Sequence, residues 1–330
     1  MLRVADIPKA DKFRSFVQAG KPGRKQQGRA GLPVQLDFED TTSDAALGFG
    51  VPPFRMQLLK WVGNKQRFAH EIARYFPRGY GTYYEPFLGS GAVMGTLAPR
   101  RAVGSDVLEP LVEIWDTLLR DPELLKTWYS GRWNSMMRHT QTPQMGYAAI
   151  RDSYNRRPNG ADLLMISRAC YGGIVRFRQD GYLSTPCGVH KPIAPESFAR
   201  RVDEWRARLQ GASFAVCDFA DTMADAKRGD VVYCDPPYTC TQAILYGAQT
   251  FNLKRLFVEI DRCKERGVLV ALSIDGSKRS GDVICDVPIP SGLFEREATV
   301  NCGRSMLRRF QLEGQSLEGE VVKDRLLLTY

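Results

Sequence analysis

The stretch TYYEPFLGSGAVMGTLAPRRAVGSD, residues 82–106, decides the fold that we predict for this chain. Its first four residues are typical of a strand, and a glycine-rich turn and a short helix near residues 92–98 follow. A second strand at residues 102–105 ends at Asp106, and a strongly amphipathic helix begins near Leu108. This order of strand, turn, helix, strand and helix is that of the first half of a doubly wound α/β sheet.

The rest of the chain divides where the sequence pattern changes. Residues 123–205 lack the apolar alternation of strands, are helical in parts, and are rich in Gly, Pro and Arg at residues 171–195. We therefore predict a mainly helical subdomain at 123–205, inserted into a sheet domain formed by residues 53–122 and 206–330. Further strands are expected at residues 213–217, 231–234, 268–272 and 326–330, and further helices at residues 65–76 and 253–266.

The composition indicates an ordinary globular protein, with 43% hydrophobic and 25% charged residues in a chain of 330. No stretch approaches about 18 apolar residues, and no apolar signal-peptide core is visible, so neither a membrane span nor secretion is expected. Eight cysteines without a Cys-x-x-Cys pair, together with only three histidines, argue against a zinc or other metal site. The same cysteine usage favours reduced thiols in a cytoplasm.

Basic residues are unevenly distributed along the chain. The net charge is +9; residues 1–30 contribute +6 (eight Lys and Arg against two Asp), residues 151–208 contribute +5 (eleven against six acids), and the remainder sums to −2. Two basic zones on a near-neutral body suggest a polyanionic partner. Residues 1–52 are expected to form a basic, poorly ordered extension, for which nonspecific phosphate contact is a compatible second role.

The glycine-rich turn and the acid after the second strand form the first candidate site. Glycines at 89 and 91 allow the backbone to approach a ligand closely. A dinucleotide fingerprint would need Gly at position 94, where Met94 stands, so NAD is disfavoured. Asp106 is placed to bind ribose hydroxyls at the end of its strand, although it could instead cap the helix that follows.

The second candidate site is Asp235-Pro236-Pro237-Tyr238, directly after the apolar run at residues 231–234. The acid and a neighbouring backbone carbonyl can both accept hydrogen bonds from an exocyclic NH2 group. The prolines hold these acceptors rigid, because their φ is fixed and they offer no N–H. The tyrosine can stack on a ring. The four residues together predict a site for a flat ring that carries an amino group.

These sites, and their order, resemble those of the Dam-like family of DNA N6-adenine methyltransferases, over roughly residues 55–330. Lys60-Trp61-Val62-Gly63-Asn64-Lys65 is similar to the opening segment of the family, and residues 85–91 to its Glu-Pro-Phe-x-Gly-x-Gly turn. Residues 230–238 match its catalytic strand and loop almost residue for residue, and Asp106 falls at the position of its ribose-binding acid. Asp218 and Phe219 are similar to the segment that precedes the catalytic strand.

The resemblance implies a Rossmann-like sheet that binds S-adenosylmethionine as its cofactor. It also implies a mechanism, in which the two N6 protons of a flipped adenine bond to the Asp235 carboxylate and the Pro236 carbonyl. These bonds would localise the nitrogen lone pair and aim it at the methyl group, with Tyr238 stacked on the base and Tyr246 or Phe251 on its other face. The catalytic residues are then Asp235, Pro236, Pro237 and Tyr238. The cofactor-binding residues are Trp61, for which core packing is the alternative, Lys65, Glu85, Pro86, Phe87, Gly89, Gly91, Asp106, Asp218, Phe219 and Asp235.

Double-stranded DNA is the partner that the resemblance implies, and the basic part of the inserted region is expected to contact it. The candidate DNA-binding residues are Lys60, Arg156, Arg157, Arg168, Arg176, Arg178, Gln179 and Lys191, each of which could instead be a solvated surface group. Residues 176–188 keep the frame of the base-reading hairpin of the family. Asp180 stands where relatives that read GATC carry an arginine, so GATC is not assumed.

Several alternatives remain open at this level. The enzyme could act alone or with a cognate restriction endonuclease, and its expected place is the cytoplasm of a prokaryote or of a phage-infected cell, at the nucleoid. Methylation of adenine in RNA is conceivable, whereas cytosine N4 and glutamine are disfavoured because such enzymes usually carry Ser or Asn in place of Asp235. A DNA-binding module without catalysis belongs to another class, and the intact sequence around Asp235 argues against it.

Overall fold

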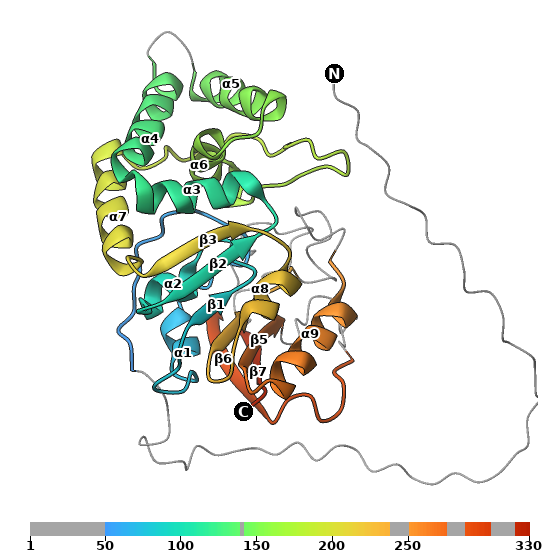
Figure 1. Ribbon diagram of the computed structural model, residues 1–330. Coiled ribbons are helices and arrows are strands. Elements are labelled where there is room, and N and C mark those ends of the chain that lie inside the picture. Colours follow the sequence, from blue (N-terminus) through green and yellow to red (C-terminus); the bar gives the residue numbers. More distant parts are fainter. Residues whose placement is uncertain (1–49, 139–141, 238–250, 276–287, 305–320) are drawn as a thin grey trace, which may run out of the picture. The chain divides into compact units, whose positions relative to one another are not determined.

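The computed structural model describes residues 50–138, 142–237, 251–275, 288–304 and 321–330 (Figure 1). The extension expected at residues 1–52 therefore lies almost entirely outside the described residues. Tyr238 and Tyr246 also lie outside them.

The described strands form one sheet in the order β3-β2-β1-β4-β5-β7-β6. Neighbours from β3 to β5 are parallel, and β7 runs antiparallel to both β5 and β6. Strand order reverses between β1 and β4, which is the point where doubly wound sheets open a crevice for ligands. This arrangement confirms the predicted α/β class with a Rossmann-like sheet. The strands are β1 (Tyr83–Glu85), β2 (Ala102–Asp106), β3 (Ala212–Val216), β4 (Val231–Cys234), β5 (Leu269–Asp275), β6 (Arg296–Arg304) and β7 (Val321–Leu328).

Helices cover both faces of the sheet, because side chains of the buried strands alternate between two apolar clusters. Tyr83 and Tyr233 belong to the cluster that holds α1 to α7, while Tyr84 and Val232 belong to the cluster beneath α8 and α9. Figure 1 shows the two sets of helices on opposite faces. The helices are α1 (Ala69–Ala73), α2 (Ala92–Leu97), α3 (Glu109–Arg120), α4 (Pro122–Met136), α5 (Pro143–Arg156), α6 (Gly160–Ala169), α7 (Pro195–Arg208), α8 (Phe219–Asp225) and α9 (Leu253–Glu265), with a 3-10 turn at Tyr171–Gly173.

Helix starts follow their capping residues. Asp121 accepts a bond from Leu124 N before α4, and Pro122 fills the first helical position, where its missing N–H costs no hydrogen bond. Asn252 accepts bonds from Lys254 N and Arg255 N before α9. These polar residues fix where the helices begin.

The region at residues 123–205 is mainly helical in the structure. Its helices α4 and α6 pack on α3, and their apolar side chains join the cluster on that face of the sheet. Residues 44–330 accordingly form one compact unit. The residues at which the inserted region begins and ends, and its role as a recognition unit, stay predictions.

Side chains of the inserted region hold the backbone just before the first motif. The guanidinium of Arg168 donates to the carbonyls of Gln57 and Leu58, both at 3.0 Å. Arg201 donates to the Gln57 carbonyl at 2.8 Å, and Trp205 Nε1 donates to the carbonyl of Met56 at 2.6 Å. These bonds fix residues 56–58 against α6 and α7 and so position residues 60–65, which follow directly.

Two predicted details differ from the structure. The helix expected at residues 65–76 is regular only over α1, because residues 66–68 and 74–75 form turns. Strand β6 was not predicted; it is an edge strand that begins with the exposed residues Arg296 and Glu297, and it lacks a continuous apolar run. Among the described residues, no helix combines the length and apolar character that crossing a membrane requires.

Candidate active site

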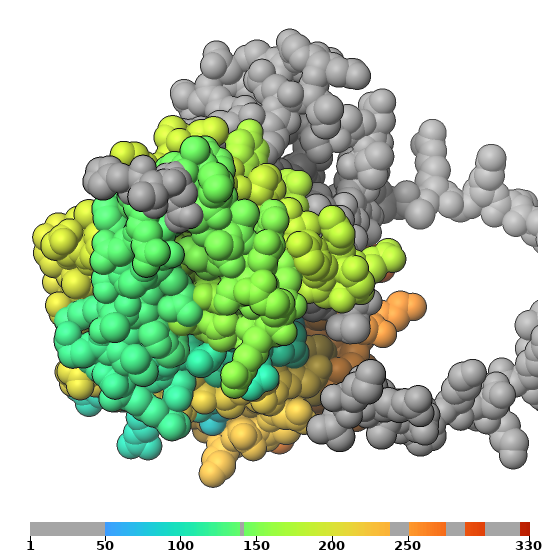
Figure 2. All heavy atoms as spheres, turned by 90° about the horizontal axis from the view of Figure 1, so that it is seen from above, coloured from blue at the N-terminus to red at the C-terminus, as the bar shows by residue number. Residues whose placement is uncertain are grey.

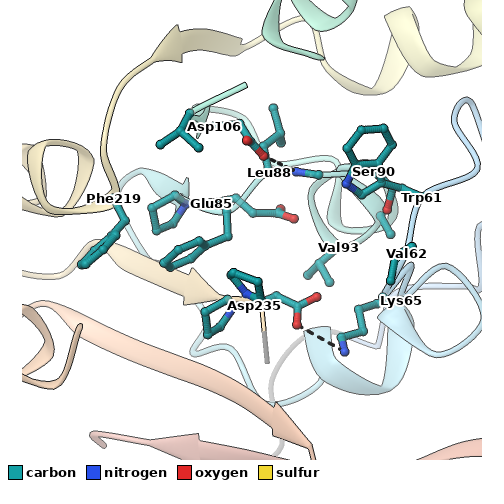
Figure 3. A pocket seen from close by; sticks show the side chains of 18 of the residues that line it. Trp61, Val62, Lys65, Glu85, Leu88, Ser90, Val93, Asp106, Phe219 and Asp235 are labelled. Carbon is teal, nitrogen blue, oxygen red and sulfur yellow. Dashed lines mark hydrogen bonds and ion pairs between the residues drawn. The ribbon is translucent and has the colours of Figure 1, made fainter. Parts of the chain in front are cut away.

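A pocket opens at the carboxyl ends of β1, β2 and β4, at the reversal of strand order (Figure 3). It brings together residues from both candidate sites and from the opening motif. Among the predicted cofactor residues, only Gly91 is absent from its lining. The lining is Trp61, Val62, Gly63, Lys65, Glu85, Pro86, Phe87, Leu88, Gly89, Ser90, Ala92, Val93, Asp106, Val107, Val175, Asp218, Phe219, Asp235, Pro236, Pro237 and Phe251.

The glycine turn takes its shape from two left-handed residues. Gly89 has φ 46° and Gly91 has φ 57°, backbone conformations that residues other than glycine rarely adopt. A Cβ atom on Gly89 would lie 3.2 Å from the Trp61 ring, and one on Gly91 would lie 3.2 Å from Trp115. Gly89 therefore admits Trp61 to the pocket wall, while Gly91, just before α2, leaves room for Trp115 of α3.

Asp106 combines the two roles that its sequence position left open. Its Oδ1 accepts a bond from Leu108 N and its Oδ2 accepts one from Gly89 N, both at 3.1 Å. The carboxylate thus ties the glycine turn to the start of α3, and it also lines the pocket (Figure 3). Asp106 therefore caps α3 and lines the pocket at the same time.

Asp235 lies beside a buried ammonium group. Lys65 Nζ is 3.2 Å from Asp235 Oδ1, and Lys65 is only 5% exposed. The same ammonium donates to Asp324 Oδ2 at 2.9 Å. Figure 3 shows the Asp235 carboxylate directed toward Lys65 at the edge of the pocket. Sequence analysis did not identify Asp324, because it reaches the site only through the pairing of β7 with β5.

Glu85 ends β1 in a buried position next to this group. Burial raises its pKa to about 8, and the Asp235 charge acts in the same direction. Bonds from the Tyr83 hydroxyl at 2.9 Å and from Met94 N at 3.0 Å partly offset the increase. Near neutral pH the Glu85 side chain is therefore mostly the uncharged acid.

Aromatic rings form another wall of the pocket. Phe87 and Phe219 stack with their centroids 5.3 Å apart, and Phe251 meets Phe87 edge-on at 5.7 Å. Arg255 lies over the Phe219 ring and forms an ion pair with Asp218 at 2.8 Å. These rings give the pocket an apolar, polarisable surface on this side.

Arg168 corrects the list of candidate DNA-binding residues. It is 4% exposed, and its guanidinium is engaged by backbone carbonyls inside the protein. Lys60 is half-buried. The other candidates have exposed side chains: Arg156, Arg157, Arg176, Arg178, Gln179 and Lys191. Arg168 is thus a structural residue rather than a surface group.

The segment at residues 176–184 is a hairpin in the structure. Phe177 pairs with Leu183, and Arg178 N donates to the Tyr182 carbonyl at 2.9 Å. At its tip, Asp180 Oδ1 accepts a bond from Tyr182 N at 3.0 Å, and the Arg178 guanidinium lies 4.8 Å from the Tyr182 ring centroid. Figure 2 shows this end of the molecule, with α4 and α5 in green and residues of the hairpin region in yellow-green. Asp180 therefore stabilises the backbone at the tip of the hairpin and also places a carboxylate there.

Three relatives show what the chain is similar to. A DNA N-6-adenine-methyltransferase of Escherichia phage P1 is 32% identical over 56% of this chain and 24% of its own length. The retron Ec67 DNA adenine methylase of Escherichia coli is 30% identical over 56% of this chain and 64% of its own. A DNA adenine methylase of Vibrio cholerae is 26% identical over 65% of this chain and 79% of its own. The chain thus spans less than two thirds of the first two relatives.

A family model provides the wider match. The family is described as D12 class N6 adenine-specific DNA methyltransferase, and its model matches residues 61–260, more than half of the chain. The matched part contains the glycine turn, Asp106, and β4 with Asp235 directly after it. The chain belongs to the D12 class N6 adenine-specific DNA methyltransferase family.

Proposed function

We propose that this protein transfers a methyl group from S-adenosylmethionine to N6 of adenine in double-stranded DNA. One observation carries the proposal: Asp235 and Pro236, directly after β4, line the same pocket as the glycine turn and Asp106. Chemistry of the catalytic loop and binding of a nucleoside-containing donor would then take place in one cavity. Family membership supports the same reaction.

The pocket residues fit the methyl donor in their chemistry. Asp106 offers carboxylate oxygens for ribose hydroxyls, and Phe219 with Phe87 offers ring faces for adenine. Trp61 presents a ring face that suits a sulfonium. Gly89 keeps the wall open where a Cβ atom would crowd the Trp61 ring. When bound, S-adenosylmethionine supplies an electrophilic methyl group on sulfur.

The residues of the chain prepare the amino group of the target. Its nitrogen lone pair is delocalised into the adenine ring and is a poor nucleophile. Hydrogen bonds from the two N6 protons to the Asp235 carboxylate and the Pro236 carbonyl localise the lone pair and orient it for in-line displacement. The nitrogen must lose one proton when the N–C bond forms, and the Asp235 carboxylate is the acceptor at hand.

The target base leaves the helix stack at a cost of about a few kcal/mol in this proposal. Exposed basic side chains of the inserted region, with Arg178 on the hairpin, hold the duplex through phosphates and base edges. Tyr238 is proposed to stack on the flipped base. The proposed reaction is the same whether the enzyme acts alone or with a cognate restriction endonuclease.

Replacing the proposed acceptor tests the function. The full chain and its Asp235→Ala variant are expressed in cells that lack adenine methylation, and their DNA is read by methylation-aware sequencing. We expect N6-methyladenine in a defined sequence context with the wild type and at least a 1,000-fold lower transfer rate with the variant.

Asp221→Ala is the matched control, because Asp221 is an exposed carboxylate on α8 outside the pocket lining. It should leave the rate unchanged. Wild-type cells without N6-methyladenine, or an active Asp235→Ala variant, would contradict the proposal. Methylation of RNA but not of DNA by the purified chain would favour the RNA alternative instead.

A further inference from the structure

Two cysteines face each other at the base of the hairpin that leaves the end of α6 (Figure 1). Cys170 pairs with Cys187 in an antiparallel bridge. Two backbone hydrogen bonds flank this pair: Tyr171 N donates to the Pro186 carbonyl at 2.9 Å, and Gly188 N donates to the Ala169 carbonyl at 2.8 Å. Because these bonds join the neighbours of the cysteines rather than the cysteines themselves, Cys170 and Cys187 form a non-hydrogen-bonded pair of the ladder.

This register suits a disulfide bond. Directly opposed residues of an antiparallel ladder direct their side chains to the same face. In a non-hydrogen-bonded pair the Cα atoms lie about 4.5 Å apart, within the range of about 4.4 to 6.8 Å that disulfides span. The backbone at Cys170 is extended, with φ −71° and ψ 159°. A bond between the two sulfurs therefore requires rotation of side chains and keeps the backbone register.

The hydrogen bonds of the two thiols are weak and local. Cys170 Sγ donates to the Ser167 carbonyl at 3.8 Å, and Cys187 Sγ donates to the Gly188 carbonyl at 3.5 Å. A thiol is a weak donor, so a disulfide would forfeit little at either position. Cys170 is only 4% exposed, whereas Cys187 is half-buried. A small reagent therefore reaches Cys187 first.

We propose that Cys170 and Cys187 are a modification site, at which a low-molecular-weight disulfide oxidises the two thiols to an intramolecular disulfide that closes residues 171–186. The Cys187 thiolate attacks one sulfur of the reagent and releases half of it as a thiolate. The Cys170 thiolate then attacks the Cys187 sulfur and releases the second half. Two protein thiols become one disulfide, and the reagent is reduced to two thiols, which take up both protons.

The closed loop contains residues of two surfaces described above. Val175 lines the pocket, and Arg178 is an exposed residue of the hairpin. Because the bond forms in the existing register, it holds this arrangement in place. Closing a loop of about 15 residues also reduces the freedom of the unfolded chain, which stabilises the folded protein. The modification does not depend on the reaction proposed for the pocket.

Burial controls the rate of this oxidation. It raises the pKa of the Cys170 thiol to about 12, and it also raises the pKa of the Cys187 thiol. The thiolate is the attacking form, so below these pKa values its amount rises about 10-fold with each pH unit. Bridge formation should therefore be slow at neutral pH and should accelerate as the pH is raised. A rate that does not rise with pH would contradict thiolate exchange at this pair.

The test incubates the full chain with oxidised glutathione, alkylates the remaining thiols and maps the peptides by mass spectrometry. We expect a peptide pair linked through Cys170 and Cys187, and a thermal-unfolding midpoint at least about 5 °C higher in the oxidised chain. A reducing agent should reverse both changes. Alkylation of both thiols after oxidation, or glutathione that stays on Cys187 without transfer to Cys170, would overturn the proposal.

Two variants identify the pair as the cause. Cys187→Ser should remove both the linked peptides and the stabilisation by oxidised glutathione. The matched control is Cys217→Ser, which removes another half-buried thiol, one that follows β3 and lies 3.1 Å from Thr222 Oγ1. It should leave the bridge and the midpoint shift intact. A shift that persists in Cys187→Ser, or a bridge from Cys170 to a different cysteine, would overturn the assignment.

Discussion

Lys65 and Arg168 are both buried cations, 5% and 4% exposed, yet their surroundings differ in kind. The Lys65 ammonium at the edge of the pocket lies between two carboxylates. The Arg168 guanidinium in the inserted region donates to backbone carbonyls, and burial lowers its pKa although a nearby tyrosine partly offsets this. Both residues occupy positions at which sequence analysis predicted a ligand contact.

The difference teaches how to separate a functional cation from a structural one. Carbonyl groups cannot lose or gain a proton, so the bonds of Arg168 only fix backbone in place. Carboxylates carry charge that a substrate can use, and they can also exchange protons. The acceptors, rather than the burial, indicate where chemistry occurs.

The largest expected effect comes from removing the pocket cation. Lys65→Met removes the ammonium that lies 3.2 Å from Asp235 and 2.9 Å from Asp324, so the Asp235 carboxylate loses the buried group that orients it. We expect the methylation rate to fall at least 100-fold, about 2.7 kcal/mol in the barrier. The rate is measured in single-turnover assays. A Lys65→Met rate within about 3-fold of wild type would mean that Lys65, like Arg168, has only a structural role.

Arg168→Met is the counterpart in the inserted region. It leaves the carbonyls of Gln57 and Leu58 without this donor, at a cost of about 2 kcal/mol in unfolding free energy. The rate per folded molecule should stay within about 3-fold of wild type. Denaturant unfolding and the methylation assay are compared on one preparation; a stable but inactive variant would show that Arg168 acts in the reaction.

Glu85 sharpens the comparison through pH. Its pKa is raised from 4.5 to about 8 in the folded protein, so between these values the folded state binds a proton that the unfolded state has lost. Stability therefore falls as pH rises through this window, by about 1.4 kcal/mol per pH unit at most. Glu85→Gln should flatten the thermal-melting profile between pH 5 and about 8. An unchanged slope would mean that Glu85 titrates normally.

Arg178 is an exposed cation of the inserted region and should behave unlike Arg168. Arg178→Ala removes a side chain that lies over Tyr182 at the hairpin tip. We expect DNA binding to weaken about 5-fold, or about 1 kcal/mol, with a changed site preference or a smaller salt dependence. Arg200→Ala on α7, exposed and outside the candidate set, is the control. Unaltered affinity and preference would show that the hairpin does not contact DNA.

Much of the fold could be predicted from the sequence, because local signals agree with the final structure. The glycine turn, Asp106 and the apolar run of β4 carry strong patterns; the turn and Asp106 lie at the ends of parallel strands, and the run is a parallel strand itself. Edge strand β6 escaped prediction, although Ala298, Val300 and Cys302 alternate along it. A half-exposed strand has only a weak apolar signal.

The candidate site was predicted less completely. Asp324 has no local motif, since its position depends on the antiparallel register of β7 with β5. Val175 reaches the pocket from the inserted region, which no spacing in the sequence indicated. Arg168 was assigned to the surface because composition does not distinguish an arginine that binds carbonyls inside the protein from one that faces DNA. Contacts between distant segments decide each of these cases.

The bonds that hold residues 56–58 have a consequence for engineering the protein. Arg168, Arg201 and Trp205 donate to carbonyls that precede the first motif of the chain. If residues 123–205 alone were exchanged between relatives, the donor side chains would be replaced while the segment that accepts their hydrogen bonds, residues 56–58, would not. A working chimera must carry residues 56–58 together with the side chains that donate to them, so the unit of exchange is discontinuous.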